Sequence, residues 1–350
     1  SRCLFSLSLF FEMKRLLSNV INLTLVLILG VALSGCTVSN ADMGTSSPWS
    51  PVDLDTKANP LDIDFVDDKN GFLVGTDRLI LETNDGGITW NERNLDIPNE
   101  GNFRLISVDF KDQEGWIAGQ PGLILHTKDG GKNWTRLDLG NKLPGDPYLI
   151  TTIDSDSAEL ATTAGAIYKT TDGGSNWDAL VIDTSGSGGI RELRRTPNGG
   201  YISVSSLGNF FSVLNPDEET WSPHQRASSK RVQSVGEQPN GDLWMLSRGA
   251  EIRFNADSDD VDSWSKPIIP IVNGYNYQDL GWDPVESIWA AGGNGTLLVS
   301  NDDGKTWEQD PVGDSVPTNF IRILFVDDSN SASTKGFVFG ERGKLLRWRG

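Results

Sequence analysis

Cysteine and histidine are scarce in this chain of 350 residues, which has only two of each. A disulfide framework needs several cysteine pairs, so stability has to come from a hydrophobic core. His126 and His224 lie far apart in the sequence, and we expect a structural role for each and no shared metal site. The Gly-rich segment 184–189 lacks the strand-to-helix pattern of a phosphate-binding loop. We therefore expect neither a metal nor a bound cofactor.

Basic side chains are also few, with 30 Lys and Arg against 48 Asp and Glu and a formal net charge of −18. Residues 1–35 carry three basic side chains and one acidic one, so the rest of the chain has a net charge of about −20. Such a balance argues against a nucleic-acid partner and against electrostatic adhesion to anionic lipid.

The apolar run from Val20 to Leu33 is too short to span a bilayer stably. It follows Lys14 and Arg15 and ends in the sequence Leu-Ser-Gly before Cys36, which is typical of a secretory signal. The end of the run is similar to a bacterial lipoprotein cleavage site, at which Cys36 becomes the lipidated first residue. A plain signal peptide followed by an incidental cysteine is the alternative.

We divide the N-terminal region accordingly. Residues 1–35 are expected to be the signal peptide, and residues 1–12 lie upstream of the natural start at Met13. Residues 36–47 are expected to form the lipidated N-terminus and a small, polar tether. The folded domain is then residues 48–350.

Tryptophan recurs at a nearly fixed interval. Seven of these residues are 41 to 44 positions apart: Trp49, Trp90, Trp134, Trp177, Trp221, Trp264 and Trp307. Chance placement of a rare residue does not produce such spacing. A period in this range, with four short strands in each repeat, is typical of propeller blades, and the number of copies predicts seven blades.

Most repeats contain a turn built on aspartate and glycine. The sequence Asn-Asp-Gly-Gly precedes Trp90, and close variants precede Trp134, Trp177 and Trp307. The Asp can accept hydrogen bonds from its own turn, the Gly can take a positive φ, and the Trp can bury its ring. One such Asp in each blade is a scaffold pattern, because a catalytic site needs unlike groups that converge.

Each repeat also has the same order of strands. We expect the innermost strands at 61–65, 105–110, 149–153, 190–193, 232–235, 277–280 and 321–325. Three more strands follow in each repeat, which gives four antiparallel strands per blade. The last repeat ends after its third strand, and residues 49–54 supply the fourth. The prediction is an all-β fold, a seven-bladed β-propeller whose ring is closed by the N-terminal strand joining the C-terminal blade.

Arginine is unevenly distributed over this predicted ring. Inner strands line the channel of a propeller, and the loops into them share a face with the turns between second and third strands. Seven arginines are predicted on that face: Arg78, Arg104, Arg191, Arg231, Arg248, Arg322 and Arg342. Three more add charge around blades three to five: Arg194, Arg195 and Arg226. Guanidinium groups bind carboxylates in pairs, so a negatively charged peptide or a chain's C-terminus is a natural ligand. The alternative is that these arginines neutralise neighbouring Asp and Glu.

The segments 115–134 and 191–201, the lipoprotein signal and the seven copies resemble the photosystem II assembly and stability factor of cyanobacteria and plastids. The likeness covers roughly residues 36–350. Sialidases share the Asp turns, so the segment 191–201 and the layout of the whole chain are the more specific part of the resemblance.

The resemblance implies a non-catalytic assembly chaperone, lipid-anchored on the lumenal side of the thylakoid membrane. Members bind the newly made precursor of a reaction-centre core subunit and act in early photosystem II assembly and repair. The basic patch of the family maps onto Arg191, Arg194, Arg195, Arg226, Arg231 and Arg248. An additional basic face would comprise Arg78, Arg104, Arg322 and Arg342. We expect a monomer that meets early assembly intermediates.

A second hypothesis is a membrane-anchored, sialidase-like glycoside hydrolase or a glycan-binding propeller. Such an enzyme needs three converging arginines, an acid, and a tyrosine nucleophile beside a carboxylate. Tyr148, Tyr201, Tyr275 and Tyr277 show no obvious carboxylate partner in the sequence.

Overall fold

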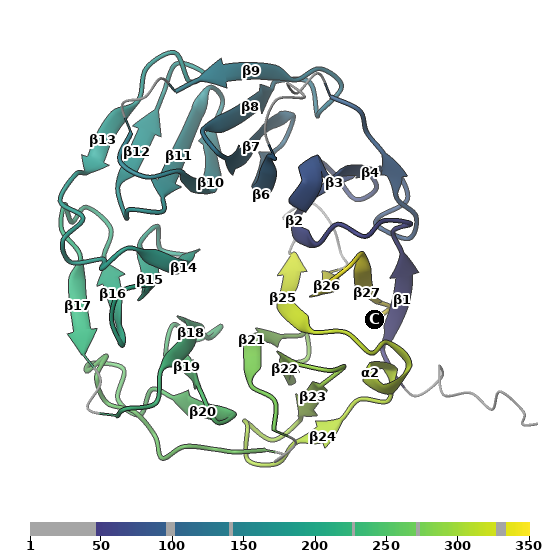
Figure 1. The fold of residues 1–350 in the computed structure, drawn as a ribbon, viewed down its shortest axis with the longest axis vertical. Coiled ribbons are helices and arrows are strands. Elements are labelled where there is room, and N and C mark those ends of the chain that lie inside the picture. Colours follow the sequence, from purple (N-terminus) through teal and green to yellow (C-terminus); the bar gives the residue numbers. More distant parts are fainter. Residues whose placement is uncertain (1–46, 96–101, 140–142, 226–227, 271–273, 327–333) are drawn as a thin grey trace, which may run out of the picture. The chain divides into compact units, whose positions relative to one another are not determined.

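The computed structural model describes residues 47–350 apart from 96–101, 140–142, 226–227, 271–273 and 327–333. Residues Ser47–Gly350 form one compact unit, a ring of seven sheets (Figure 1). The predicted signal peptide (1–35), lipidated Cys36 and the tether up to Ser46 lie outside the described residues. Among the residues that are described, no helix is long and apolar enough to cross a bilayer.

The predicted seven-bladed, all-β propeller is confirmed, and the blades follow one another along the chain. The innermost strands are β2 (Pro60–Phe65), β6 (Arg104–Lys111), β10 (Pro147–Asp154), β14 (Ile190–Arg195), β18 (Val232–Glu237), β21 (Tyr277–Trp282) and β25 (Phe320–Val326). The second strands are β3 (Gly71–Gly75), β7 (Glu114–Gln120), β11 (Ser157–Thr162), β15 (Tyr201–Ser205), β19 (Leu243–Ser247), β22 (Ile288–Gly292) and β26 (Lys335–Gly340).

The third strands are β4 (Ile80–Thr83), β8 (Leu123–Thr127), β12 (Ile167–Thr170), β16 (Phe210–Leu214), β20 (Glu251–Phe254), β23 (Leu297–Ser300) and β27 (Lys344–Trp348). The outer strands are β5 (Asn91–Glu92), β9 (Thr135–Asp138), β13 (Asp178–Val181), β17 (Ser222–Gln225), β24 (Glu308–Gln309) and β1 (Trp49–Asp53). Two short helices lie between strands: η1 (Thr76–Arg78) and α2 (Val312–Ser315). In the fifth blade the bridges Ile252↔Ile268 and Asn255↔Trp264 take the place of an outer strand.

The ring is closed as predicted. β1 pairs antiparallel with β27, from Trp49 opposite Trp348 to Asp53 opposite Lys344. The Trp49 ring is 1% exposed and lies edge-on to Trp289 of the sixth blade, with 5.4 Å between ring centroids. The two ends of the chain therefore share one sheet and one hydrophobic cluster.

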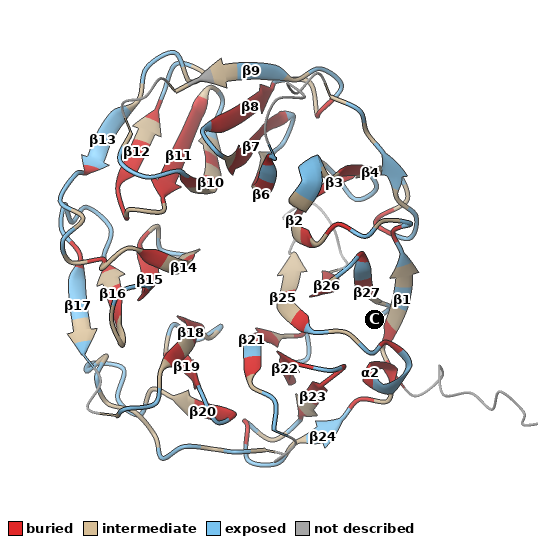
Figure 2. Ribbon diagram, in the orientation of Figure 1, coloured by how far each residue is buried: buried red, intermediate tan, exposed pale blue. Residues whose placement is uncertain are grey.

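The core lies between adjacent blades. The second strands are buried along almost their whole length, as the red segments of Figure 2 show. Such strands pack against a sheet on both faces, which favours the apolar runs seen in Phe72–Val74 and Trp116–Ala118.

The Asp turns join third and outer strands and dock on the preceding blade. The Asp129 carboxylate accepts a hydrogen bond from the Asn133 backbone N–H at 2.9 Å, which lowers the pKa of Asp129 to about 2. Gly131 has a φ of +81°, and a Cβ there would lie 2.3 Å from the Phe72 ring of the preceding blade. Glycine is thus required both by the turn and by contact between blades.

The alternating strand directions give the ring two faces. The loop face contains the connections into inner strands and the turns between second and third strands, for example 205–210 and 247–251. The Asp-turn face contains the Asp turns and the turns between first and second strands. In the second blade these two turns are joined by a hydrogen bond from the Gly130 N–H to the Gln113 carbonyl. Residue Trp49 begins β1 at the Asp-turn face, because β1 runs antiparallel to β27.

Candidate binding site at the channel mouth

Every inner strand has a β-bulge near its start, directly after its first ladder pair or, in β6, after its second. A bulge leaves one residue out of the ladder and re-aims its side chain. The seven residues at these positions are Leu61, Ile106, Tyr148, Arg191, Gln233, Gln278 and Ile321. All seven line one cavity of about 550 Å³ at the loop-face end of the channel. We call this cavity the channel mouth.

In most blades the residue that follows the bulge forms a hydrogen bond to a neighbouring blade. The Asp62 carboxylate accepts a hydrogen bond from the Val108 N–H of the next blade at 3.0 Å. Asp279 does the same for the Ile323 N–H at 2.9 Å. Glu192 accepts from the Ser234 hydroxyl at 2.7 Å. These acceptors, two of them buried and Glu192 half-buried, hold the inner strands in register around the channel.

Two arginines of the predicted patch and one of the additional basic face are paired with carboxylates. Arg194 binds Glu192 at 2.7 Å and reaches Asp279 in the sixth blade at 2.6 Å. Burial opposes its charge, but the charges of Asp279 and Glu192 outweigh burial and raise the pKa of Arg194. The other two pairs are Arg195 with Glu159 at 3.1 Å and Arg322 with Asp62 at 2.7 Å.

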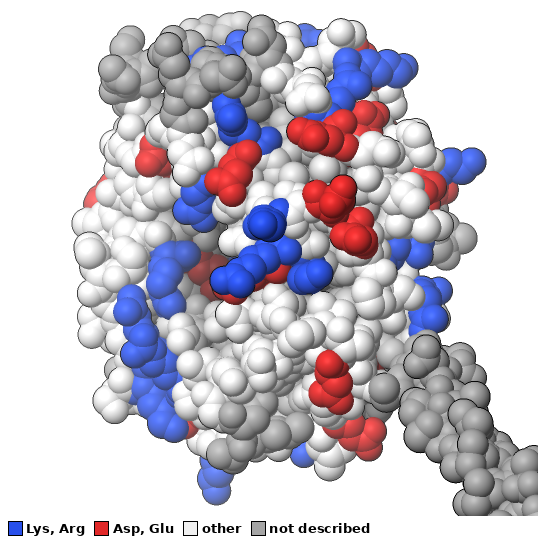
Figure 3. Space-filling view, turned by 45° about the vertical axis from the view of Figure 1, so that its right-hand side comes forward, with Lys and Arg blue, Asp and Glu red and all other residues white. Residues whose placement is uncertain are grey.

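Several arginines of the loop face form no ion pair with a described residue, among them Arg104, Arg191, Arg231 and Arg248. Arg191 donates to Gln233 Oε1 at 3.1 Å and to the Val232 carbonyl. The Arg248 N–H donates to the Arg231 carbonyl, which places these two side by side. Burial, and next the like charge of Arg231, lower the pKa of Arg191, while the charge of Glu192 acts in the opposite direction. The group is therefore a cluster of positive charge that is only partly offset, and basic side chains gather beside a hollow in Figure 3.

The predicted patch is thus divided by the fold. Arg191 lies near the start of β14, whereas Arg195 ends that strand at the Asp-turn face and pairs with Tyr201. Arg194 lies inside the channel between them, with 29% of its side chain exposed. Arg226 lies outside the described residues. The structure brings together Arg191, Arg231 and Arg248, and whether they bind a partner stays a prediction.

The additional basic face is spread around the ring. Arg104 lines the channel mouth, and Arg322 lies deeper in the channel against Asp62. Arg78 lies in η1 and donates its N–H to the Phe103 carbonyl, and Arg342 lies in the turn between β26 and β27. Both are exposed, in the first and seventh blades, away from Arg231 in the fifth.

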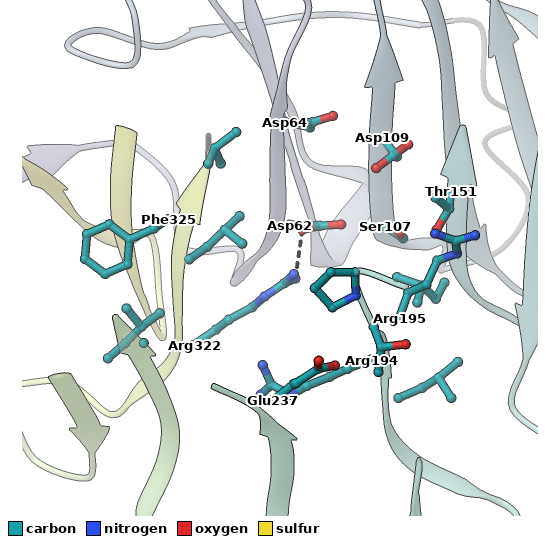
Figure 4. Close-up of a pocket in the computed structure, with 18 of the residues that line it drawn as sticks. Asp62, Asp64, Ser107, Asp109, Thr151, Arg194, Arg195, Glu237, Arg322 and Phe325 are labelled. Carbon is teal, nitrogen blue, oxygen red and sulfur yellow. Dashed lines mark hydrogen bonds and ion pairs between the residues drawn. The ribbon is translucent and has the colours of Figure 1, made fainter. Parts of the chain in front are cut away.

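The Asp-turn half of the channel is a second cavity, of about 720 Å³, whose lining includes four carboxylates and three arginines among apolar residues. In Figure 4 the Arg322 side chain points to Asp62, with Asp64 and Asp109 further along. Burial raises the pKa of Asp109 to about 7. Burial and the charge of Asp109 also raise the pKa of Asp64 well above its ordinary value. Their oxygens accept backbone hydrogen bonds from Phe110 and Thr152, so they serve as contacts between blades.

Glu114, His126 and Asp156 place their ligand atoms within 4.8 Å of one another and are a candidate metal cluster among the described residues. His126 Nε2 lies 2.5 Å from Glu114 Oε1, and the ring stacks on Trp116. The Lys128 ammonium contacts Asp156 and already supplies a cation there. Hydrogen bonds of Glu114 to His126 and to the Asp156 N–H, together with the Lys128–Asp156 ion pair, explain this cluster as a contact between the second and third blades.

The tyrosine–carboxylate pair that a sialidase needs is present, and the sequence did not reveal it. The Tyr201 hydroxyl donates to Glu159 Oε2 at 2.8 Å, and Arg195 binds the same carboxylate. Tyr201 is 4% exposed, and burial followed by the charge of Glu159 raises the pKa of its phenol. A nucleophile needs the opposite shift and access to substrate, so this geometry does not activate Tyr201.

The basic loop face and the buried tyrosine–glutamate pair favour a binding propeller over a sialidase-like enzyme. The chain belongs to the family of the photosynthesis system II assembly factor YCF48, whose model matches residues 41–349. The resemblance seen in the sequence is confirmed, and the family is an assembly factor and not an enzyme.

The relatives agree over nearly the whole chain. A photosystem II assembly lipoprotein of Prochlorococcus marinus (strain NATL2A) is 89% identical, over 97% of this chain and 100% of the relative. A solved structure described as YCF48 bound to D1 peptide is 41% identical, with a TM-score of 0.80, over 87% of this chain and 97% of that chain. YCF48 from Cyanidioschyzon merolae is 36% identical, with a TM-score of 0.79, over 86% and 99%.

Proposed function

We propose that this chain is a photosystem II assembly factor that binds the reaction-centre subunit D1 through its loop face. The observation that carries the proposal is the cluster of Arg191, Arg231 and Arg248, none of which forms a salt bridge with a described carboxylate, although the charge of Glu192 partly offsets that of Arg191. A solved relative with the same fold holds a D1 peptide. Guanidinium groups pair with carboxylates, so an acidic stretch or a free C-terminus of D1 is the expected ligand.

The finer parts of the function rest on the family and on the sequence. We propose that the newly made, precursor form of D1 is bound, and that the complex joins early assembly intermediates. The relatives are named lipoproteins, and Cys36 follows the sequence Leu-Ser-Gly. Lipidation of Cys36 would then hold a monomeric propeller on the lumenal side of the thylakoid membrane.

A binding titration tests this function. The unit 47–350, which is compact by itself, is titrated against short overlapping synthetic peptides that cover D1. The test variant is Arg191→Glu/Arg231→Glu/Arg248→Glu. The matched control, Lys69→Glu/Lys132→Glu/Lys305→Glu, makes the same change of charge on exposed residues of the Asp-turn face.

The expected result is that the wild type and the control bind the same peptides and that the loop-face variant binds none of them. Circular dichroism must show the same fold in all three proteins. Equal binding by the loop-face variant would show that the arginine cluster is not the site. Absence of binding by the wild type would remove D1 as the partner.

A further inference from the structure

The channel mouth has two chemically different halves. Blades seven, one and two place apolar bulge residues in it: Ile321, Leu61 and Ile106. Blades four, five and six place polar ones: Arg191, Gln233 and Gln278. Tyr148 lies at the boundary, and its hydroxyl donates to the Arg191 carbonyl at 3.2 Å. The same position of the repeat therefore carries apolar residues on one side of the ring and polar residues on the other.

The polar half offers donors. The Nε of Arg191 is buried and makes no hydrogen bond with a described residue. Gln233 accepts from Arg191 through Oε1, which leaves its amide N–H groups for a ligand. Gln278 is exposed, and the exposed Arg104 adds a second guanidinium at the opposite side of the cavity.

The carboxylates that line the mouth are already engaged. Asp62 is bound by Arg322, and both Glu192 and Asp279 are bound by Arg194. None of them forms a salt bridge with Arg191 or Arg104, although the charge of Glu192 partly offsets that of Arg191. An anion is therefore the group that the remaining hydrogen-bonding capacity of the mouth fits.

The apolar half of the channel mouth favours an apolar group of a ligand. Leu61, Ile106 and Ile321 are only half-buried although they face a cavity and not the outer surface. An apolar side chain placed against them would remove that surface from water. A volume of about 550 Å³ is within the usual range for a site that holds a small ligand or a few residues of a peptide.

We propose that the channel mouth is a specificity pocket for a polypeptide segment in which a large apolar side chain lies next to a carboxylate. The apolar side chain packs on Leu61, Ile106 and Ile321. The carboxylate, either an Asp or Glu side chain or a C-terminus, binds Arg191, with Gln233 and Gln278 as additional donors. This inference rests on the proposed function, and it names which feature of an acidic partner is selected.

The test uses the D1 peptide set together with an unrelated peptide set that varies one Leu-Asp pair to Ser-Asp and to Leu-Asn. Ile106→Ser removes apolar surface from the pocket. Gln278→Trp fills the mouth from an exposed position and so leaves the core intact. The controls are Leu207→Ser on the loop-face rim and Val285→Ser on the Asp-turn face, both highly exposed apolar residues.

We expect Ile106→Ser to weaken Leu-Asp peptides roughly tenfold, the value of one buried aliphatic side chain, while Ser-Asp peptides change little. Gln278→Trp should abolish binding of both, and the two controls should bind as the wild type does. If Ile106→Ser and Gln278→Trp bind like the wild type while the arginine variant does not, the ligand lies on the rim and the pocket is refuted, although the proposed function stands.

Two other results separate the inference from the function. If no D1 peptide binds but unrelated Leu-Asp peptides bind and are lost in Gln278→Trp, the pocket stands and D1 is the wrong partner. If no peptide of either set binds, both fail. Anionic phosphatidylglycerol vesicles are the last arm, and binding of vesicles alone, lost in Leu207→Ser, would overturn the pocket in favour of a lipid surface.

Discussion

Arg194 and Arg231 lie one blade apart and have opposite surroundings. Arg194 lies inside the channel between Glu192 and Asp279, and its charge is neutralised within the protein. Arg231 lies on the loop face, where its guanidinium donates to the Ser206 carbonyl at 3.2 Å and meets no carboxylate of a described residue. Neutralisation, one of the two alternatives raised by the sequence, therefore holds for Arg194, whereas Arg231 remains free of a salt bridge and partner binding by it stays a prediction.

The comparison teaches that an arginine count does not measure a binding patch. Arginines on the inner wall hold blades together, because the side chains that cross the channel meet acids from other repeats. Those on the loop face are spaced by turns, and at Arg191 the like charges of Arg231 and Arg248 oppose the charge of Glu192. The first group should govern stability and the second should govern affinity.

The largest expected effect is on stability, in Arg194→Met. This change leaves Asp279, whose side chain is 1% exposed, without its counter-charge. Loss of one partner of a buried pair costs about 3 kcal/mol of unfolding free energy. Urea unfolding should show this loss, whereas Arg231→Met should stay within about 0.5 kcal/mol of the wild type. Equal losses would erase the distinction between the two groups.

The next effect is on affinity, in Arg231→Ala/Arg248→Ala. Charge-assisted hydrogen bonds contribute about 2 kcal/mol, so affinity for the tightest D1 peptide should fall roughly thirtyfold. Fluorescence anisotropy would measure it, with Lys69→Ala/Lys132→Ala as the control for lost charge. Unchanged affinity, or the same loss in the control, would speak against the loop-face group.

A smaller effect is expected in the pH dependence of stability. The folded-state pKa of Asp109 is raised to about 7, above its value of 3.8 in an unfolded chain. Its stabilising contribution is therefore fully present below pH 3.8 and is lost as pH rises through about 7. Thermal unfolding between pH 5 and pH 8 should show decreasing stability, and Asp109→Asn should flatten this slope while keeping the acceptor for the Thr152 N–H.

At low pH a second group opposes this increase in stability. The lowered pKa of Asp129 acts in the opposite direction, since its contribution is present above pH 3.8 and is lost as pH falls through about 2. A slope that is unchanged in Asp109→Asn would show that the channel carboxylates do not cause the decline.

The smallest effect is expected for Arg342→Ala. Arg342 is exposed in the seventh blade, away from the loop-face group, and its N–H donates to Asn59 Oδ1 through the backbone. Removing such a charge should alter the association rate slightly at low salt and affinity less than about twofold. Stopped-flow mixing at two salt concentrations would measure it, and a loss as large as that of the Arg231 variant would extend the site around the ring.

The blade number and the strand order could be predicted from the sequence because their causes are local. Each Trp fills the same gap between blades, and each Asp turn needs its own Asp and Gly, so both recur at the repeat period. Closure by β1 followed from the incomplete last repeat, since Trp348 lies in a third strand.

The channel mouth could not be predicted in the same way. A bulge changes which side chain faces the channel without a fixed residue type, so Leu61, Gln233 and Ile321 share a position but no chemistry. An alignment of the seven repeats at this position was the one signal available. The ion pair of Arg194 with Asp279 joins residues two repeats apart, across the channel, and no local pattern reveals it.

The closing strand β1 also determines how the ring responds to force. Trp49 forms the first of the five ladder pairs between β1 and β27. The Ser47 hydroxyl accepts a hydrogen bond from the Trp49 N–H. We expect a force applied to the chain before residue 47 to act on β1 at this point and to separate β1 from β27 one ladder pair at a time. The contacts of the Trp49 ring with Trp289 and Trp348 are the first that such a force would have to break.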